Sequence, residues 1–267
     1  MSVPLHSRIL GPSTGAGGVP VLLLHGLFGA GDNLGALARD LASNRTVVLV
    51  DLRNHGQSPH VEHLDLAAMA EDVLALQRHL GFDQCDLVGH SLGGKVAMQV
   101  ALNFPAHVRR LVIADIAPVL YAPGHDAVFA ALGAVDLRAV ERRSDADAMM
   151  TPHISEPMLR QFLLKSLYRD NSGIKEPGGY HWRFNLPALK ANYAAIRAAP
   201  TGQPFAGPTL FIKGELSDYI TAEHEPLLRQ WFPHFEFNTI AGAGHWLHGD
   251  KPEAFNRLVN TFLSAAA

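Results

Sequence analysis

A serine lies between two glycines in the segment Gly89-His90-Ser91-Leu92-Gly93, directly after an apolar run and directly before apolar residues at helical spacing. A strand that turns at once into a helix holds its central residue in a strained conformation. Only small residues two positions to either side let the two backbones pass. Gly89 and Gly93 occupy those two positions. The segment therefore predicts a nucleophile elbow, the sharp turn that presents a reactive serine at the edge of a sheet.

Short continuous apolar runs alternate along the chain with segments of helical periodicity. Such runs are typical of strands buried on both faces of a parallel sheet, with helices covering each face. The pattern predicts an α/β fold with a mostly parallel central sheet. The expected strands are 19–24, 46–50, 85–88, 111–114, 209–212 and 235–240. The expected helices are 34–41, 69–80, 92–104 and a last helix that starts at a capping box formed by Asp250 and Glu253.

The interval 118–205 interrupts this alternation and shows no convincing buried strand. We expect it to be a helical cap inserted after the sixth strand, which leaves residues 1–117 and 206–267 as the α/β core. A turn is expected within the cap at Pro177-Gly178-Gly179. The helix-like segments of the cap are 127–132, 158–167 and 186–196.

Length and composition narrow the function classes. The 267 residues, 48% of them hydrophobic, fit one catalytic domain with an insertion. No apolar run approaches the roughly 18 residues that span a bilayer, so no membrane insertion is expected. A formal charge of −3 without a basic cluster argues against nucleic acid and favours a small-molecule partner. The first residues lack the pattern of a secretory signal and Cys85 is the single cysteine, so a cytoplasmic location is expected.

A serine hydroxyl is a poor nucleophile unless a base takes its proton and an acid orients that base. Among 15 histidines, His245 is the best-placed base, because Gly242–Trp246 follows the last expected strand and precedes the last helix. The chain order nucleophile, acid, histidine leaves three candidates for the acid. Asp115 follows the strand before the insertion, whereas Glu215 and Asp218 follow the strand after it.

The other prominent histidines have structural interpretations. We expect His25 to brace a turn, His90 to point away from the nucleophile, and His248 to be a surface residue. His60 and His63 have a spacing that suits a metal on a helix, but no carboxylate or cysteine pattern accompanies them, so no metal is expected. No nucleotide or flavin motif is present, so no cofactor is expected.

Several motifs in this order resemble the α/β-hydrolase superfamily. More narrowly, they resemble the small bacterial esterases of the YbfF type and the abhydrolase-domain-containing group. In that subgroup the acid precedes the cap, which implies Asp115. In most of the superfamily the acid follows the next strand instead. In this chain Asp218 stands one position later than that pattern requires. Asp218 is therefore the alternative acid, and Glu215 comes third. The motifs are His25–Gly29, Asp51–Ser58, the Ser91 elbow, Asp115–Pro118, Trp182–Asn185 and Gly244–Trp246.

The resemblance implies an α/β-hydrolase fold and a serine hydrolase that cleaves carboxylic esters of small or short-to-medium acyl groups through an acyl-enzyme. The amides of Leu27 and Leu92 are expected to hold the oxyanion, with Phe28 as the alternative to Leu27. Lactonase, thioesterase, carbon–carbon bond hydrolase and cofactor-free haloperoxidase activities use the same residues, and a non-catalytic binding protein is a further alternative. The expected substrate-binding residues, each of which has packing as its competing interpretation, are Phe28, Phe129, Phe162, Trp182 and Trp246.

Overall fold

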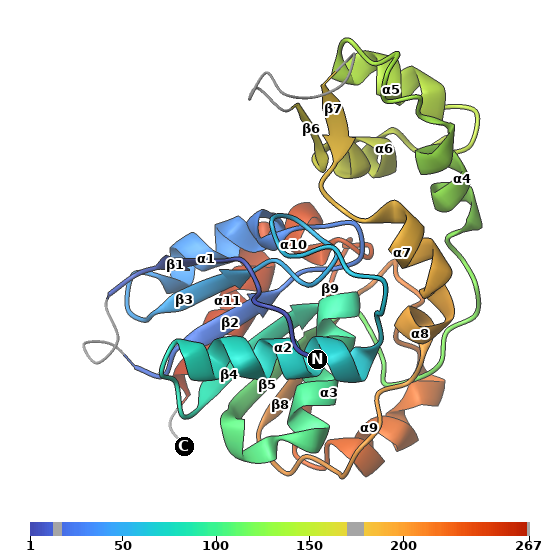
Figure 1. The fold of residues 1–267 in the computed structure, drawn as a ribbon. Coiled ribbons are helices and arrows are strands. Elements are labelled where there is room, and N and C mark those ends of the chain that lie inside the picture. Colours follow the sequence, from blue (N-terminus) through green and yellow to red (C-terminus); the bar gives the residue numbers. More distant parts are fainter. Residues whose placement is uncertain (13–17, 170–178, 266–267) are drawn as a thin grey trace.

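The computed structural model describes residues 1–12, 18–169 and 179–265 and builds them around one large sheet (Figure 1). Within these ranges the sheet has seven strands in the order β1-β3-β2-β4-β5-β8-β9. Strand β1 pairs antiparallel with β3, and the remaining neighbours pair in parallel. The predicted mostly parallel sheet is confirmed. The strands are β1 (Ser7–Leu10), β2 (Val21–Leu24), β3 (Val47–Val50), β4 (Cys85–His90), β5 (Val108–Ala114), β8 (Thr209–Gly214) and β9 (Phe235–Ile240).

Helices cover both faces of this sheet, as predicted. Helices α2 (Leu66–His79) and α3 (Leu92–Asn103) pack against each other on one face. Helices α1 (Gly35–Leu41) and α11 (Pro252–Ser264) pack against each other on the opposite face. Helix α9 (Glu225–Trp231) contributes Leu228 to the hydrophobic core beneath α2 and α3. Among the described segments, no helix has both the length and the apolar character to cross a bilayer.

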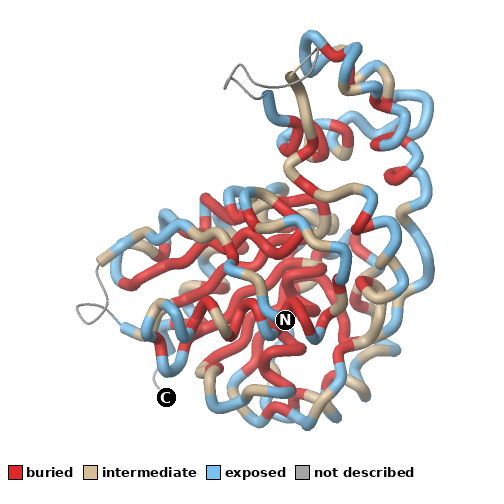
Figure 2. Tube along the Cα trace, in the orientation of Figure 1, coloured by how far each residue is buried: buried red, intermediate tan, exposed pale blue. Residues whose placement is uncertain are grey.

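Strand β2 shows why the central strands have continuous apolar sequences. All four of its residues are buried, but Leu22 and Leu24 belong to the core under α2 and α3, whereas Val21 and Leu23 belong to the core under α1 and α11. Successive side chains of a strand point to opposite faces, so a strand covered on both faces is apolar at every position. Figure 2 shows this buried centre on the strands and on the helix surfaces that face them.

The segment between β5 and β8 is mainly helical, and helices occupy most of each of the three expected segments, but residues 165–167 of the second segment are not helical. Helices α4 to α6 and a two-stranded sheet lie to one side of the main sheet, and α7 and α8 lead back towards it (Figure 1). The short β6–β7 hairpin and α5 were not predicted, and Pro177 and Gly178 of the expected turn lie outside the described residues. The elements are α4 (Asp126–Ala134), α5 (Arg143–Met150), α6 (Pro157–Leu164), β6 (Leu167–Arg169), β7 (Tyr180–Trp182), α7 (Leu186–Ala191) and α8 (Tyr193–Arg197).

Two expectations about the elements were wrong. The insertion follows β5, the fifth strand in chain order rather than the sixth, because in the described part of the chain β1 is the one strand that precedes β2. The capping box at Asp250 and Glu253 does not form, because Lys251 is the N-cap of α11 and makes no side-chain cap. Asp250 belongs instead to α10 (Leu247–Asp250), and its Oδ2 accepts a hydrogen bond from the Gly244 amide at 2.8 Å.

The turn from β4 into α3 has the strained geometry expected of an elbow. Ser91 has φ 52° and ψ −116°, in the left-handed region that side chains disfavour. A Cβ atom on Gly89 would overlap the carbonyl oxygen of Gly93, and a Cβ atom on Gly93 would overlap that of Leu24 in β2. The two glycines are therefore required because three backbone segments meet at this point.

Replacing Gly93 with alanine tests this crowding. The overlap is with backbone that is fixed in the sheet, so we expect Gly93→Ala to lower the free energy of unfolding by about 3 kcal/mol or more. Gly133→Ala is the matched control, because Gly133 lies in α4 with open space around its Cα, and alanine there should raise stability by up to about 1 kcal/mol. Urea unfolding measures both, and equal stability of the two variants would contradict the crowding argument.

Candidate active site

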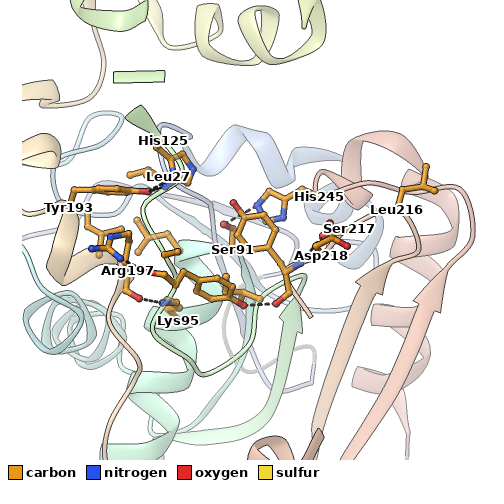
Figure 3. Close-up of a pocket in the computed structure, with 17 residues that line it drawn as sticks. Leu27, Ser91, Lys95, His125, Tyr193, Arg197, Leu216, Ser217, Asp218 and His245 are labelled. Atoms are coloured by element: carbon orange, nitrogen blue, oxygen red, sulfur yellow. Dashed lines mark hydrogen bonds between the residues drawn. The ribbon is translucent and has the colours of Figure 1, made fainter. Parts of the chain in front are cut away.

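Three polar side chains meet at the carboxyl ends of neighbouring strands. Ser91 follows β4, Asp115 follows β5, and His245 lies in the loop between β9 and α10. Because these strands are parallel, the loops at their carboxyl ends share one edge of the sheet. Figure 3 shows His245 directed at Ser91 from the loop opposite.

The three side chains form a continuous hydrogen-bonded chain. His245 Nε2 lies 3.1 Å from Ser91 Oγ, and its Nδ1 lies 2.7 Å from Asp115 Oδ2. A carboxylate on Nδ1 fixes the ring as the tautomer whose Nε2 lone pair faces the hydroxyl. The ring also stacks on Tyr219, with centroids 4.0 Å apart and planes 21° apart. The imidazole is thus held in the orientation and tautomer that a general base requires.

The Asp115 carboxylate is itself held rigidly. It is fully buried, and its Oδ1 accepts a hydrogen bond from the Gly214 amide at 2.9 Å. Ser217 donates its hydroxyl proton to Oδ2, the oxygen that also contacts His245. Donors to a buried carboxylate stabilise its charged form, which is the form that orients a histidine.

Of the three candidate acids, Asp115 is the one that contacts His245. Asp218 is exposed and lies at the lip of the cavity beside Ser91. Glu215 is also exposed, and its Oε2 accepts a hydrogen bond from the Gly242 amide at 2.7 Å. Ser217, which stands where most of the superfamily has an aspartate, supports Asp115 instead.

The candidates for the oxyanion hole differ in their availability. The amide of Phe28 donates a hydrogen bond to His55 Nε2 at 3.2 Å and is therefore engaged. Leu27 and Leu92 both line the cavity that contains Ser91. Phe28 has φ 63°, so the loop that carries Leu27 turns sharply at the next residue.

Two buried neutral histidines hold that loop. His25 Nδ1 donates to the Gly26 carbonyl at 2.8 Å and its Nε2 accepts from the Leu52 amide at 3.1 Å, so its predicted bracing role is confirmed. His55 Nδ1 donates to the Arg53 carbonyl at 3.0 Å while its Nε2 accepts from Phe28. Burial lowers the pKa of both rings, that of His55 to about 3. Each ring is therefore a donor and an acceptor at neutral pH, as these contacts require.

Two further histidines lie beneath His245. His90 Nε2 donates to the carbonyl oxygen of His245 at 2.8 Å, and burial lowers the pKa of His90 well below its usual value. The His248 ring lies 4.5 Å from that of His90, its Nδ1 is buried, and burial lowers its pKa to about 4. The expectation that His248 is a surface residue was wrong, because α10 turns its ring inward against His90.

Ser91 borders two cavities. The larger, of about 450 Å³, is open to solvent and lies between the insertion and the loop after β8 (Figure 3). The smaller, of about 50 Å³, contains three of the expected substrate-binding residues, Phe28, Phe162 and Trp246. Side chains outside the five expected substrate-binding residues line the larger cavity, and they include Lys95, Tyr121, His125, Tyr193, Arg197 and Tyr219.

The other two expected substrate-binding residues are packing residues, so that expectation was wrong. Phe129 is buried in an aromatic cluster, with its ring centroid 5.5 Å from that of Phe28. Trp182 is also buried and stacks on Phe184, with centroids 5.3 Å apart and planes 11° apart. Neither lines a cavity beside Ser91. Phe129 contacts Phe28 directly, and Trp182 contacts it through Phe184, whose ring lies 5.3 Å from that of Phe28. These rings pack the insertion against the loop of Phe28.

Comparisons with known proteins agree with this fold and site. The family model described as alpha/beta hydrolase fold matches residues 19–252. Esterase YbfF of Escherichia coli is 38% identical over 92% of this chain and 93% of its own length. The mouse sn-1-specific diacylglycerol lipase ABHD11 is 39% identical over 91% of this chain and 80% of its own length. A solved marine microorganism esterase superposes with a TM-score of 0.91 at 37% identity, covering 98% of this chain and all of that one.

The chain therefore belongs to the α/β-hydrolase fold family. Within that family it belongs with the YbfF-like and abhydrolase-domain-containing proteins, as the motifs indicated.

Asparagine substitutions distinguish the acids. Asp115→Asn keeps the shape of the side chain but stabilises the wrong tautomer of His245, so kcat should fall by about four orders of magnitude. Asp218→Asn is the matched control, and it should change kcat by less than about tenfold because that carboxylate does not contact the ring. Steady-state hydrolysis of a short p-nitrophenyl ester measures both. A larger loss in Asp218→Asn would reverse the assignment.

The buried histidines predict a loss of stability in acid. The folded-state pKa values of His25, His55, His90 and His248 are lowered, so between pH 7 and 5 the unfolded chain binds protons that the folded chain excludes. The free energy of unfolding should therefore decrease as the pH is lowered from 7 to 5, by up to about 1.4 kcal/mol per pH unit for each histidine. Above pH 7 the free energy of unfolding should level off.

Urea unfolding at several pH values measures this slope. His55→Gln should reduce this slope by the contribution of one histidine. His79→Gln, on the exposed surface of α2, is the control and should leave the slope unchanged. An unchanged slope in His55→Gln would contradict the requirement for a neutral ring at that position.

Proposed function

We propose that Ser91, His245 and Asp115 act as a catalytic triad that hydrolyses carboxylic esters through an acyl-enzyme on Ser91. The observation that supports these roles is the chain of contacts from Ser91 Oγ to His245 at 3.1 Å and from His245 to Asp115 at 2.7 Å. The chain is an ester hydrolase, in line with the names of relatives that it matches over nine tenths of its length.

In the acylation step, His245 Nε2 takes the proton of Ser91 as Oγ attacks the ester carbonyl carbon. The resulting imidazolium is stabilised by the buried Asp115 carboxylate, which stays ionised. When the tetrahedral intermediate collapses, His245 gives its proton to the departing alcohol oxygen and the acyl group remains on Ser91. Water then repeats the sequence, with His245 as its base, and releases the carboxylic acid.

The negative oxygen of the intermediate needs fixed donors, and we assign them to the amides of Leu27 and Leu92. Leu92 is the first residue of α3, where backbone amides have no partner within the helix. Leu27 is favoured over Phe28 because the Phe28 amide donates to His55. His25 and His55 then act as positioning residues that hold the loop of Leu27 before substrate arrives.

The larger cavity supports a small or short-to-medium acyl substrate. Its volume of about 450 Å³ lies within the range of about 300–1,000 Å³ that is typical of small-molecule sites. We propose that residues 118–205 form a cap that selects the substrate, on a core made of residues 1–117 and 206–267. The insertion supplies His125, Tyr193 and Arg197 to the cavity wall.

We also propose a small-molecule ester as the partner and the cytoplasm as the location. Cys85, the single cysteine, is buried in β4, and burial raises the pKa of its thiol. A buried thiol of this kind serves packing and gives the fold no disulfide, as is usual in reducing compartments.

Removing the nucleophile tests the mechanism. Ser91→Ala should lower kcat by three to six orders of magnitude on p-nitrophenyl butyrate, roughly the cost of losing a triad member. A fluorophosphonate probe should label the unaltered protein at Ser91 and leave Ser91→Ala unlabelled. Ser155→Ala, on the exposed surface of the insertion, is the control for both measurements. Full activity in Ser91→Ala would contradict the acyl-enzyme.

A further inference from the structure

Two cationic side chains line one wall of the larger cavity. Lys95 comes from α3 and Arg197 from the end of α8, and both line the cavity that contains Ser91 (Figure 3). Within the part of the chain that the structure describes, neither forms an ion pair with a carboxylate. Asp218, which also lines this cavity, is exposed and lies across it from Arg197. Arg197 therefore lines this cavity without a carboxylate partner among the described residues.

Lys95 is fully used by the fold. Its ammonium donates to the carbonyl oxygens of Val119 at 2.9 Å, Arg197 at 2.6 Å and Ala198 at 2.7 Å. An ammonium has three protons, so no donor is left for a ligand. Burial and the neighbouring guanidinium of Arg197 lower the pKa of Lys95 to about 7. Lys95 thus anchors the insertion and has no free donor for a ligand.

Arg197 differs because, of its three guanidinium nitrogens, Nη1 alone has a hydrogen-bond partner among the described residues. Its Nη1 donates to the Tyr121 carbonyl oxygen, and its guanidinium lies over the Tyr193 ring at 5.3 Å from the centroid. Its Nε is buried and, in the described chain, has no hydrogen-bond partner. A buried donor without a partner is costly, and an arginine held in place by two contacts is well prepared to bind an anion. The wall therefore presents a preoriented guanidinium whose Nη2 is left for a ligand, whereas Nε is enclosed by the protein.

We infer that the substrate carries a carboxylate, beside its ester group, that Arg197 binds in the larger cavity. This inference rests on the proposed ester hydrolysis at Ser91 and specifies its substrate class. A carboxylate is planar and accepts hydrogen bonds from a guanidinium in a fixed geometry. Its charge neutralises the guanidinium of Arg197, and its oxygens accept hydrogen bonds from Nη2. Purely apolar acyl esters leave both needs unmet.

Matched pairs of esters test the inference and locate the carboxylate. On the acyl side, p-nitrophenyl hydrogen adipate is compared with the neutral p-nitrophenyl adipamate. On the alcohol side, the butyrate ester of 4-hydroxybenzoate is compared with that of 4-hydroxybenzamide. In each pair the readout is the ratio of kcat/KM for the anionic ester to kcat/KM for the neutral ester. A substitution that damages the site in general lowers both values and leaves this ratio unchanged.

Arg197→Gln should lower this ratio by about tenfold to a hundredfold in one of the two pairs, the size expected for a lost charged hydrogen bond. The affected pair identifies the side of the ester that carries the carboxylate. Arg197→Lys keeps the charge without the planar group and should give an intermediate ratio. Arg138→Gln removes an exposed arginine elsewhere in the insertion and should leave the ratio unchanged.

The unaltered enzyme provides a test that needs no variant. Adipate should inhibit hydrolysis of p-nitrophenyl butyrate at least about tenfold more strongly than neutral adipamide, and the difference should shrink as salt is added. Equal inhibition by the two compounds, or equal ratios in the unaltered enzyme and Arg197→Gln for both pairs, would overturn the inference. Failure to hydrolyse any of these esters, or turnover kept in Ser91→Ala, would instead contradict the proposed function.

Discussion

The active site depends on a backbone constraint, the close approach of β2, β4 and α3 at Gly89 and Gly93. Ser91 is held at φ 52° between them, and its amide donates to the Ala114 carbonyl oxygen at 3.0 Å. That bond fixes the elbow to the end of β5, so the strain at the nucleophile is offset by the pairing of the sheet. Because neither glycine carries a Cβ atom, the serine reaches the edge of the sheet without overlap between these backbone segments.

The same arrangement repeats across the next strands and assembles the rest of the site. Asp115 also has φ 52°, and its amide donates to the Ile212 carbonyl oxygen at 2.8 Å. The Gly214 amide, at the end of β8, then donates to the Asp115 carboxylate at 2.9 Å. Each residue that leaves a strand is thus held by the neighbouring strand, and strand register sets the distances within the site. Burial lowers the pKa of His90 and of the other buried histidines at this edge.

Local sequence patterns predicted the parts of the site that depend on local backbone geometry. The spacing of Gly89, Ser91 and Gly93 is a steric requirement that the sequence displays directly. Asp115 was identified by resemblance, because its contact with His245 spans 130 positions and depends on strand order. The burial of His248 depends on how α10 packs beneath the His245 loop, which periodicity does not encode. The edge strand β1 was missed because its residues are only partly buried and lack a strong apolar pattern.

The cavity walls were the least predictable feature, and Lys95 shows why. It lies one helical turn after the nucleophile, and its amide donates to the Ser91 carbonyl oxygen at 3.1 Å. Its ammonium binds Val119, where the insertion begins, and Arg197 and Ala198, where the insertion ends. One turn of α3 therefore carries the nucleophile and anchors both ends of the insertion. The position of Arg197 relative to Ser91 is set by that shared anchor, which relates two residues 106 positions apart (197 − 91).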